Sequence, residues 1–150
     1  MCNPKSGSKA VSQYQRLYQG FEPLSSASLA AIPPTALAYL GDAIYELHIR
    51  QLYLLPSRKI NDYHQLVVAK VRAESQAQSL QQLIDLGILT DTEQNLVRRG
   101  RNAAGHPSRH LDPEVYQKAT AFEVLIAYLY LSDRDRCQFI LQHLDHETQN

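Results

Sequence analysis

The chain contains two helical stretches that are apolar on almost every side, and each holds an isolated acidic residue. The first is "LAYLGDAIYE" (37–46), in which Asp42 stands in the middle, directly after a glycine. In the second, between Ala119 and Leu131, the only charged residue is Glu123. A helix without a polar face is usually buried in a protein core. We therefore expect two core helices that pack against each other.

The rest of the sequence predicts further helices and no strands. Proline and glycine mark helix ends, because proline fits only the first turn and glycine favours the C-terminal stop. "TDTE" (90–93) matches a capping box, and Asp112 before Pro113 matches an N-cap followed by the first helical position. No period-2 pattern predicts a strand. The expected helices cover about 33–55, 60–87 as one or two helices with Gly87 at the end, 91–102, 113–131, and 132–145 with Ser132 to Asp135 as N-cap and first turn.

These elements predict an all-α fold in a single domain. We expect the helical domain to span residues 25–150, with its first helix beginning near Ile32. Residues 1–24 are rich in Ser, Gln and Gly and predict a flexible N-terminal extension.

Composition and charge exclude several classes of protein. Fifteen basic and fifteen acidic residues give a net charge of zero, so only a local cluster of charge could bind nucleic acid. Cys2 and Cys137 form neither a disulfide framework nor a metal-binding spacing. No apolar run reaches the ~18 residues of a membrane span, and the N-terminus lacks the pattern of a signal peptide. We therefore expect a cytoplasmic protein with no membrane segment.

The two isolated acids can either bind a metal ion or serve the core. Placed together in a low-dielectric site, Asp42 and Glu123 repel, and one must take a proton unless a cation lies between them. Mg²⁺ favours carboxylate oxygens, with water completing its coordination, and a bound Mg²⁺ activates water and stabilises charge on a phosphoryl oxygen. The alternative is that each acid pairs with a core arginine or caps a helix. The residues alone leave both interpretations open.

Basic residues gather in one segment of the chain. "RRGRNAAGHPSRH" (98–110) holds four arginines, two histidines and no acid, and Lys70 and Arg72 lie on the preceding helical stretch. Arginine suits phosphate because its guanidinium donates to two oxygens at once. A solvated surface loop or a site for an acidic partner are the alternatives. Beside a two-carboxylate metal site, the basic segment favours a nuclease.

These segments resemble those of a known family. "YLGDAIYE" (39–46) is similar to the signature helix of the ribonuclease III catalytic domain, whose core is Leu-Gly-Asp, and "AFEVLIAYLYL" (121–131) is similar to its second acidic helix. With "PPTALAYLGDAIYE" (33–46) and "RRGRNA" (98–103) in this order, the chain resembles the small subclass called Mini-ribonuclease III. The resemblance covers roughly residues 32–131 and implies a ribonuclease III-like endonuclease domain.

The resemblance implies a Mg²⁺-dependent endoribonuclease that hydrolyses phosphodiesters in double-stranded RNA and leaves 5′-phosphate and 3′-hydroxyl ends. Asp42 and Glu123 match the family's metal ligands. For the Mini subclass, the implied substrate is precursor of the large-subunit (23S) ribosomal RNA, cut by a homodimer; whether a ribosomal protein also takes part is left open. We add Glu46, one helical turn beyond Asp42, as a catalytic candidate that orients water; the alternative is a surface or dimer residue.

We expect the catalytic domain itself to bind RNA, since too few residues follow Leu131 for a double-stranded-RNA-binding domain. The proposed contacts are to phosphates and 2′-hydroxyls, so that A-form shape rather than sequence is recognised. The expected RNA-binding residues are Arg98, Arg99, Arg101 and Asn102, with Lys70 and Arg72 extending the surface.

The chain also departs from the family pattern. Full-length ribonuclease III has further acids at positions that match Thr35, Ala38 and Thr120, so this site has fewer direct ligands, and water or backbone carbonyls would complete the metal's coordination. Because the chain has fewer acidic residues at these positions, a second hypothesis is a non-catalytic RNA-binding or ribosome-associated module on the same fold. A third is a helical protein–protein adaptor whose acids form salt bridges.

Overall fold

The structure, a computed structural model, describes residues 22–145, and every regular element in this range is an α-helix. The all-α prediction is confirmed. The predicted flexible extension lies outside the described residues, apart from residues 22–24. No helix within 22–145 combines the length and hydropathy needed to cross a membrane. The helices are α2 (Ser26–Ala30), α3 (Pro34–Leu52), α4 (Ile60–Val71), α5 (Ala73–Asp85), α6 (Asp91–Ala103), α7 (Pro113–Ser132) and α8 (Arg134–Asp145).

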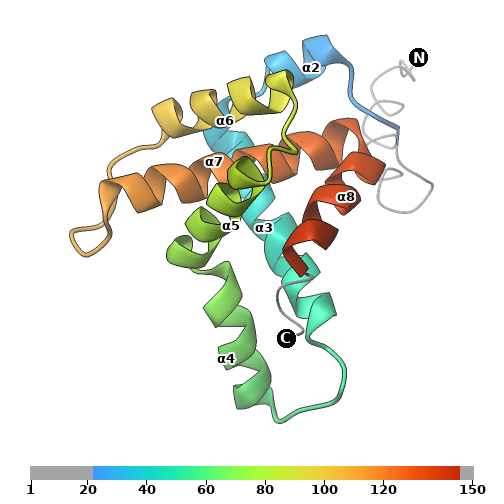
Figure 1. The fold of residues 1–150 in the computed structure, drawn as a ribbon, viewed down its shortest axis with the longest axis vertical. Helices are drawn as coiled ribbons and strands as arrows, with labels where there is room; N and C mark the ends of the chain where they lie inside the picture. Colours follow the sequence, from blue (N-terminus) through green and yellow to red (C-terminus); the bar gives the residue numbers. More distant parts are fainter. Residues whose placement is uncertain (1–21, 146–150) are drawn as a thin grey trace, which may run out of the picture.

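Helix α7 is the centre of the domain. It crosses the middle of the molecule, and α3, α5 and α6 pack around it (Figure 1). Between Ala119 and Ala127 every residue is buried except Glu123, and Phe122 and Leu125 are fully enclosed. Burial of a large apolar side chain contributes ~1.5–3 kcal/mol, so this helix supplies much of the core. Its nearly continuous apolar pattern therefore predicted its position correctly.

Helix α3 is buried along one face only. Leu37, Tyr45 and Ile49 face α7 and the core, whereas Tyr39 is 87% exposed and Leu47 is 57% exposed. The expectation of a core helix buried on all sides is therefore wrong for α3. Its apolar pattern covers two faces, of which one packs in the core and the other is open in the single chain.

Most of the predicted helix ends are confirmed. The Thr90 hydroxyl accepts a hydrogen bond from the backbone N–H of Glu93, and the Glu93 carboxylate accepts one from the backbone of Thr90. Gly87 follows α5 with a φ of 64°, the left-handed conformation that glycine adopts without strain. Asp112 caps α7. These local signals fix the ends of α5, α6 and α7.

Three helix boundaries differ from the prediction. Helix α2 precedes the expected start of order, and five residues are too few to show a helical period. Helix α3 ends at Leu52 rather than near Leu55. The 60–87 stretch, for which one or two helices were expected, is two helices that meet at Arg72. Helix α8 is capped by Asp133, whose Oδ1 accepts a hydrogen bond from the backbone N–H of Arg136 at 3.0 Å, because Ser132 still belongs to α7.

A buried ion pair joins α6 to α8. Arg136 donates through Nε and Nη2 to the two carboxylate oxygens of Glu93, both at 2.8 Å, and Glu93 is 4% exposed. Burial alone would raise the pKa of Glu93, but the hydrogen bonds from Arg136 and Thr90 outweigh it, so the pKa lies below its usual value. The Glu93 carboxylate thus caps α6 and links it to α8, and α8 covers the core beside α7.

Candidate active site

Helices α3 and α7 touch directly beside the two isolated acids. A Cβ atom added to Gly41 would lie 1.8 Å from the backbone oxygen of Glu123, so no side chain fits at this position. Glycine permits such close approach of two backbones, and Asp42 is the next residue along α3. The expected contact between the two apolar helices is confirmed, and it occurs at their acidic residues.

The two carboxylates influence each other but lie at different depths. Glu123 is half-buried; burial, followed by the negative charge of Asp42, raises its pKa to about 7, while a hydrogen bond from Gln76 acts in the opposite direction. Asp42 itself is exposed, so the expectation that it is desolvated is wrong. Within residues 22–145, neither carboxylate pairs with an arginine or lysine. The alternative role as core salt bridges is therefore not what the structure shows.

Glu123 lines a pocket of about 190 Å³ between α3, the start of α5, the end of α6 and α7. Thr35, Ala38 and Thr120 line the same pocket. The resemblance matches these three positions to the further acids of full-length ribonuclease III, and none of the three is acidic here. The other lining residues are Ala73, Ala103, Ala104, Gly105, Tyr116 and Ala119.

Gln76 of α5 belongs to this site, although the sequence analysis did not identify it. Its side chain is 1% exposed and acts on the Glu123 carboxylate, whose pKa it lowers. It shares one face of α5 with Leu80 and Leu83, which are fully buried. A polar residue at a core position of an amphipathic helix was the signal that could have found it.

Glu46 lies one turn beyond Asp42 on α3 but has a partner of its own. Its Oε1 accepts from Nη2 of Arg50 at 2.7 Å, and the Arg50 side chain is 58% exposed. Such a pair on a helix surface contributes little to stability. The catalytic role of Glu46 stays a prediction.

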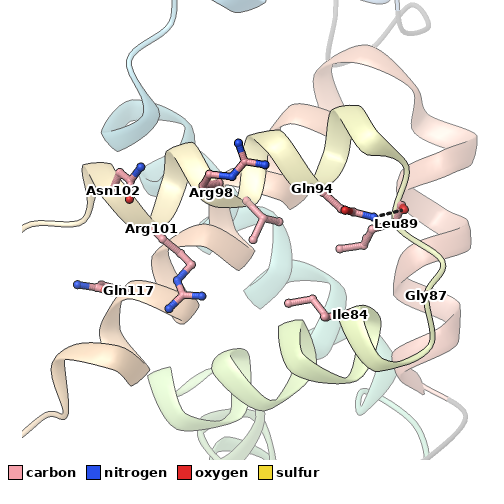
Figure 2. A pocket seen from close by; sticks show the side chains of 9 residues that line it. Ile84, Gly87, Leu89, Gln94, Arg98, Arg101, Asn102 and Gln117 are labelled. Carbon is pink, nitrogen blue, oxygen red and sulfur yellow. Dashed lines mark hydrogen bonds between the residues drawn. The ribbon is translucent and has the colours of Figure 1, made fainter.

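Three of the expected RNA-binding residues line a second pocket. Arg98, Arg101 and Asn102 border a space of about 490 Å³ between α5, α6 and the start of α7. Figure 2 shows the Arg101 side chain reaching from α6 toward α5, near Gln117 of α7. None of the described residues that line this pocket is acidic. Arg98 donates to Asn95 Oδ1 at 2.9 Å.

The other three expected RNA-binding residues are distributed differently. Arg99 is exposed on α6, one turn before Ala103, which lines the Glu123 pocket. Arg72 is also exposed and directly precedes Ala73, another residue of that pocket. Lys70 is half-buried and lines a separate pocket beside α5. Arg99 and Arg72 thus lie close in sequence to residues of α6 and α5 that line the Glu123 pocket.

Comparison with known proteins defines the class. A ribonuclease III domain model matches residues 35–134, which include both acids. This all-α domain, with one acid from each of two touching helices, is a ribonuclease III domain. Proteins named Mini-ribonuclease 3 are 51% identical in Synechococcus sp. (84% of this chain, 90% of the relative) and 50% identical in Synechocystis sp. (79% and 82%). The chain therefore belongs to the Mini-ribonuclease 3 family of ribonuclease III-type endoribonucleases.

A solved structure agrees with this assignment. A protein of Fusobacterium nucleatum, determined by X-ray crystallography, superposes with a TM-score of 0.71 at 29% identity and matches 79% of this chain and 95% of its own. The ribonuclease III-like fold predicted from the two acidic motifs is confirmed.

Proposed function

We propose that this endoribonuclease cleaves double-stranded RNA with Mg²⁺ held by Asp42 and Glu123. The observation that carries the proposal is the direct contact of α3 with α7 at Gly41 and Glu123, which brings two carboxylates from different helices into one site; the charge of Asp42 adds to burial in raising the pKa of Glu123. A cation between them relieves this repulsion. Neither acid is neutralised by a basic side chain of residues 22–145.

The donor set fits a hard, hydrated cation. Both groups offer only oxygen, and no group of three or more His, Cys, Asp or Glu side chains that could hold a metal occurs in the described part of the chain. Mg²⁺ commonly binds through one or two carboxylates and keeps several waters. When bound, it supplies an activated water and neutralises charge on the phosphodiester. Glu46 would orient that water only after it releases Arg50.

The arginines support double-stranded RNA as the substrate. A-form duplexes are recognised through phosphates and 2′-hydroxyls rather than base edges. This suits the exposed Arg99 and Arg72, which are near in sequence to residues that line the Glu123 pocket. Arg98 and Arg101 extend basic character into the second pocket. Because the whole chain has no net charge, these local cations would supply the attraction to RNA.

The open face of α3 supports a homodimer. Leu40 and Leu47, 37% and 57% exposed, lie two turns apart on one side of the helix, and Tyr39, 87% exposed, lies next to Leu40. A contiguous exposed apolar surface usually marks a protein contact, and a two-fold axis lets one surface meet its own copy. This stripe lies on the helix that carries Asp42, so a dimer would hold two sites in a fixed relation and could cut both strands.

The finer substrate assignment rests on the family alone. We propose precursor 23S ribosomal RNA, cleaved in the cytoplasm at a double-stranded stem near its ends. Incubating the purified protein with such a precursor and mapping the new 5′ ends tests this assignment.

Asp42→Asn tests the central proposal. The exchange keeps the shape of the side chain but removes its charge, so we expect an unchanged circular-dichroism spectrum and loss of at least ~99% of Mg²⁺-dependent cleavage of a duplex RNA. Asp135→Asn on α8 is the control and should cleave as the wild type does. Full activity of Asp42→Asn would remove the metal-ligand role. A wild-type protein that binds the duplex without cutting it would favour the RNA-binding alternative.

A further inference from the structure

Gln76 has an unsatisfied oxygen in a fully buried position. Its Oε1 is the one buried side-chain nitrogen or oxygen of the described residues for which no hydrogen-bond partner is present. Buried polar groups are nearly always hydrogen-bonded, because losing water without a replacement costs free energy. Among residues 22–145, this exception lies on a side chain that acts on Glu123.

Packing alone does not account for a glutamine here. Gln76 lies on the face of α5 that carries Ala77, Leu80 and Leu83 into the core, and α5 packs closely on α7. A methionine or leucine would fill similar volume and leave no polar atom without a partner. The buried amide therefore lowers the stability of the fold, and a functional role of the amide itself would explain why glutamine occupies this position.

The two ends of the amide have different requirements. The side chain favours the charged form of the Glu123 carboxylate, and only its NH₂ group can donate to that carboxylate. The oxygen on the same carbon needs a donor immediately beside that carboxylate. Asp42 and ionised Glu123 carry acceptors only, so neither can supply it. A water molecule can, and a water polarised by a cation is a strong donor.

We propose that Gln76 is a positioning residue of the metal site: its NH₂ group orients the Glu123 carboxylate, and its buried oxygen accepts a hydrogen bond from a water of the bound divalent cation. The inference rests on the proposed function of Asp42 and Glu123. Gln76 would also supply a polar group near Glu123, whose pocket has no acid at the positions matched to the further acids of full-length ribonuclease III. Partners of metal ligands commonly change metal affinity by 10- to 100-fold.

Gln76→Met provides the direct test, with Gln78→Met, an exposed position on the same helix, as the matched control. We expect Gln76→Met to melt at or above the wild-type temperature without metal, because it removes an unsatisfied polar atom. Its Mg²⁺ affinity, measured by calorimetry without RNA, should fall at least ~10-fold. The Mg²⁺ concentration for half-maximal cleavage should rise by a similar factor, with high Mg²⁺ restoring the rate. Wild-type affinity in Gln76→Met would show that the amide only packs.

A second measurement does not depend on how the variant folds. In the wild-type protein, the side-chain amide resonances of Gln76, assigned by through-bond correlation, should shift as Mg²⁺ is added and saturate together with the calorimetric isotherm. Resonances that do not move at saturating Mg²⁺ would overturn the inference. If the wild-type protein binds no Mg²⁺, the proposed function itself is wrong. If it binds Mg²⁺ but the Gln76 resonances do not shift, only the role of Gln76 is wrong.

Discussion

Glu123 is a carboxyl group whose surroundings oppose its charge. Burial and the neighbouring Asp42 raise its pKa to about 7, whereas an unfolded chain leaves a glutamate near ~4.3. Below the unfolded value both states are protonated and the group has no effect on stability. As the pH rises toward 7, only the unfolded state releases its proton, so the metal-free fold loses stability and the full cost is present above pH 7.

Glu123→Gln should therefore stabilise the metal-free protein at pH 8 and leave its stability unchanged at pH 4. We expect a gain of ~1–2 kcal/mol at pH 8, reduced from the full electrostatic value because the group is partly solvated. Urea denaturation at the two pH values measures it. Mg²⁺ should stabilise the wild type but not the variant; equal stabilisation of both would argue against Glu123 as a ligand.

At the residue scale, the sequence identified both acids because each lies within a largely apolar helical stretch. It could not tell that Asp42 is exposed and Glu123 half-buried, since depth depends on how the neighbouring helices close around each side chain. Gln76 was missed for a related reason. A single polar residue among "RAESQAQSLQQ" is inconspicuous until the face that enters the core is known.

At the scale of elements, the contact between α3 and α7 depends on a missing side chain. Gly41→Ala would place a methyl group 1.8 Å from the backbone oxygen of Glu123, so the helices would have to separate. Overpacking of this kind typically costs 1–3 kcal/mol and occasionally more, and backbone cannot move aside as a side chain can. We expect a loss of ~3 kcal/mol in urea denaturation, together with loss of the mutual influence of Asp42 and Glu123.

Gly105→Ala is the control for this change. A Cβ atom there meets nothing within 4 Å, so its stability should stay within ~0.5 kcal/mol of the wild type. A Gly41→Ala protein as stable as this control would contradict the tight contact between the two helices.

The helix ends were predictable where one local motif dictated them. The Thr90 capping box, the Asp112 cap and the Gly87 stop depend on hydrogen bonds and backbone conformation within a few residues. At the start of α8 the N-cap was expected at Ser132, but Ser132 completes α7 and Asp133 caps α8 instead. The open face of α3 was not predictable, since an apolar pattern does not distinguish a core contact from a surface that another chain could cover.

At the scale of the whole molecule, the exposed stripe of α3 predicts self-association. Leu47→Glu would place a charge in the centre of a dimer contact, and burying an unpaired charge is costly. We expect the dimer dissociation constant to rise at least ~100-fold, a typical loss for a central interface residue. Sedimentation velocity at micromolar concentration measures it. Leu66→Glu on α4 is the control; if both variants keep the wild-type mass, the stripe is not the interface.

The second pocket predicts a salt-dependent contribution to RNA binding. Phosphate contacts release counterions, so each lost contact lowers the slope of log affinity against log salt by about 1. Replacing Arg98 and Arg101 with alanine should raise KM for duplex RNA most strongly at low salt and leave kcat nearly unchanged. Cleavage assays from 50 to 300 mM KCl test this. A KM that responds to neither the substitutions nor the salt would assign this pocket another role.

The absence of a side chain at Gly41 couples the proposed metal site to the interior of the domain. The contact between α3 and α7 at Gly41 sets both the spacing of Asp42 and Glu123 and the packing of α3 against α7. A small displacement of α3 would therefore reduce turnover well before it unfolded the chain. Random variants selected only for RNA cleavage would, as a consequence, also be selected for tight interior packing, and an activity screen would report on mutations far from any substrate.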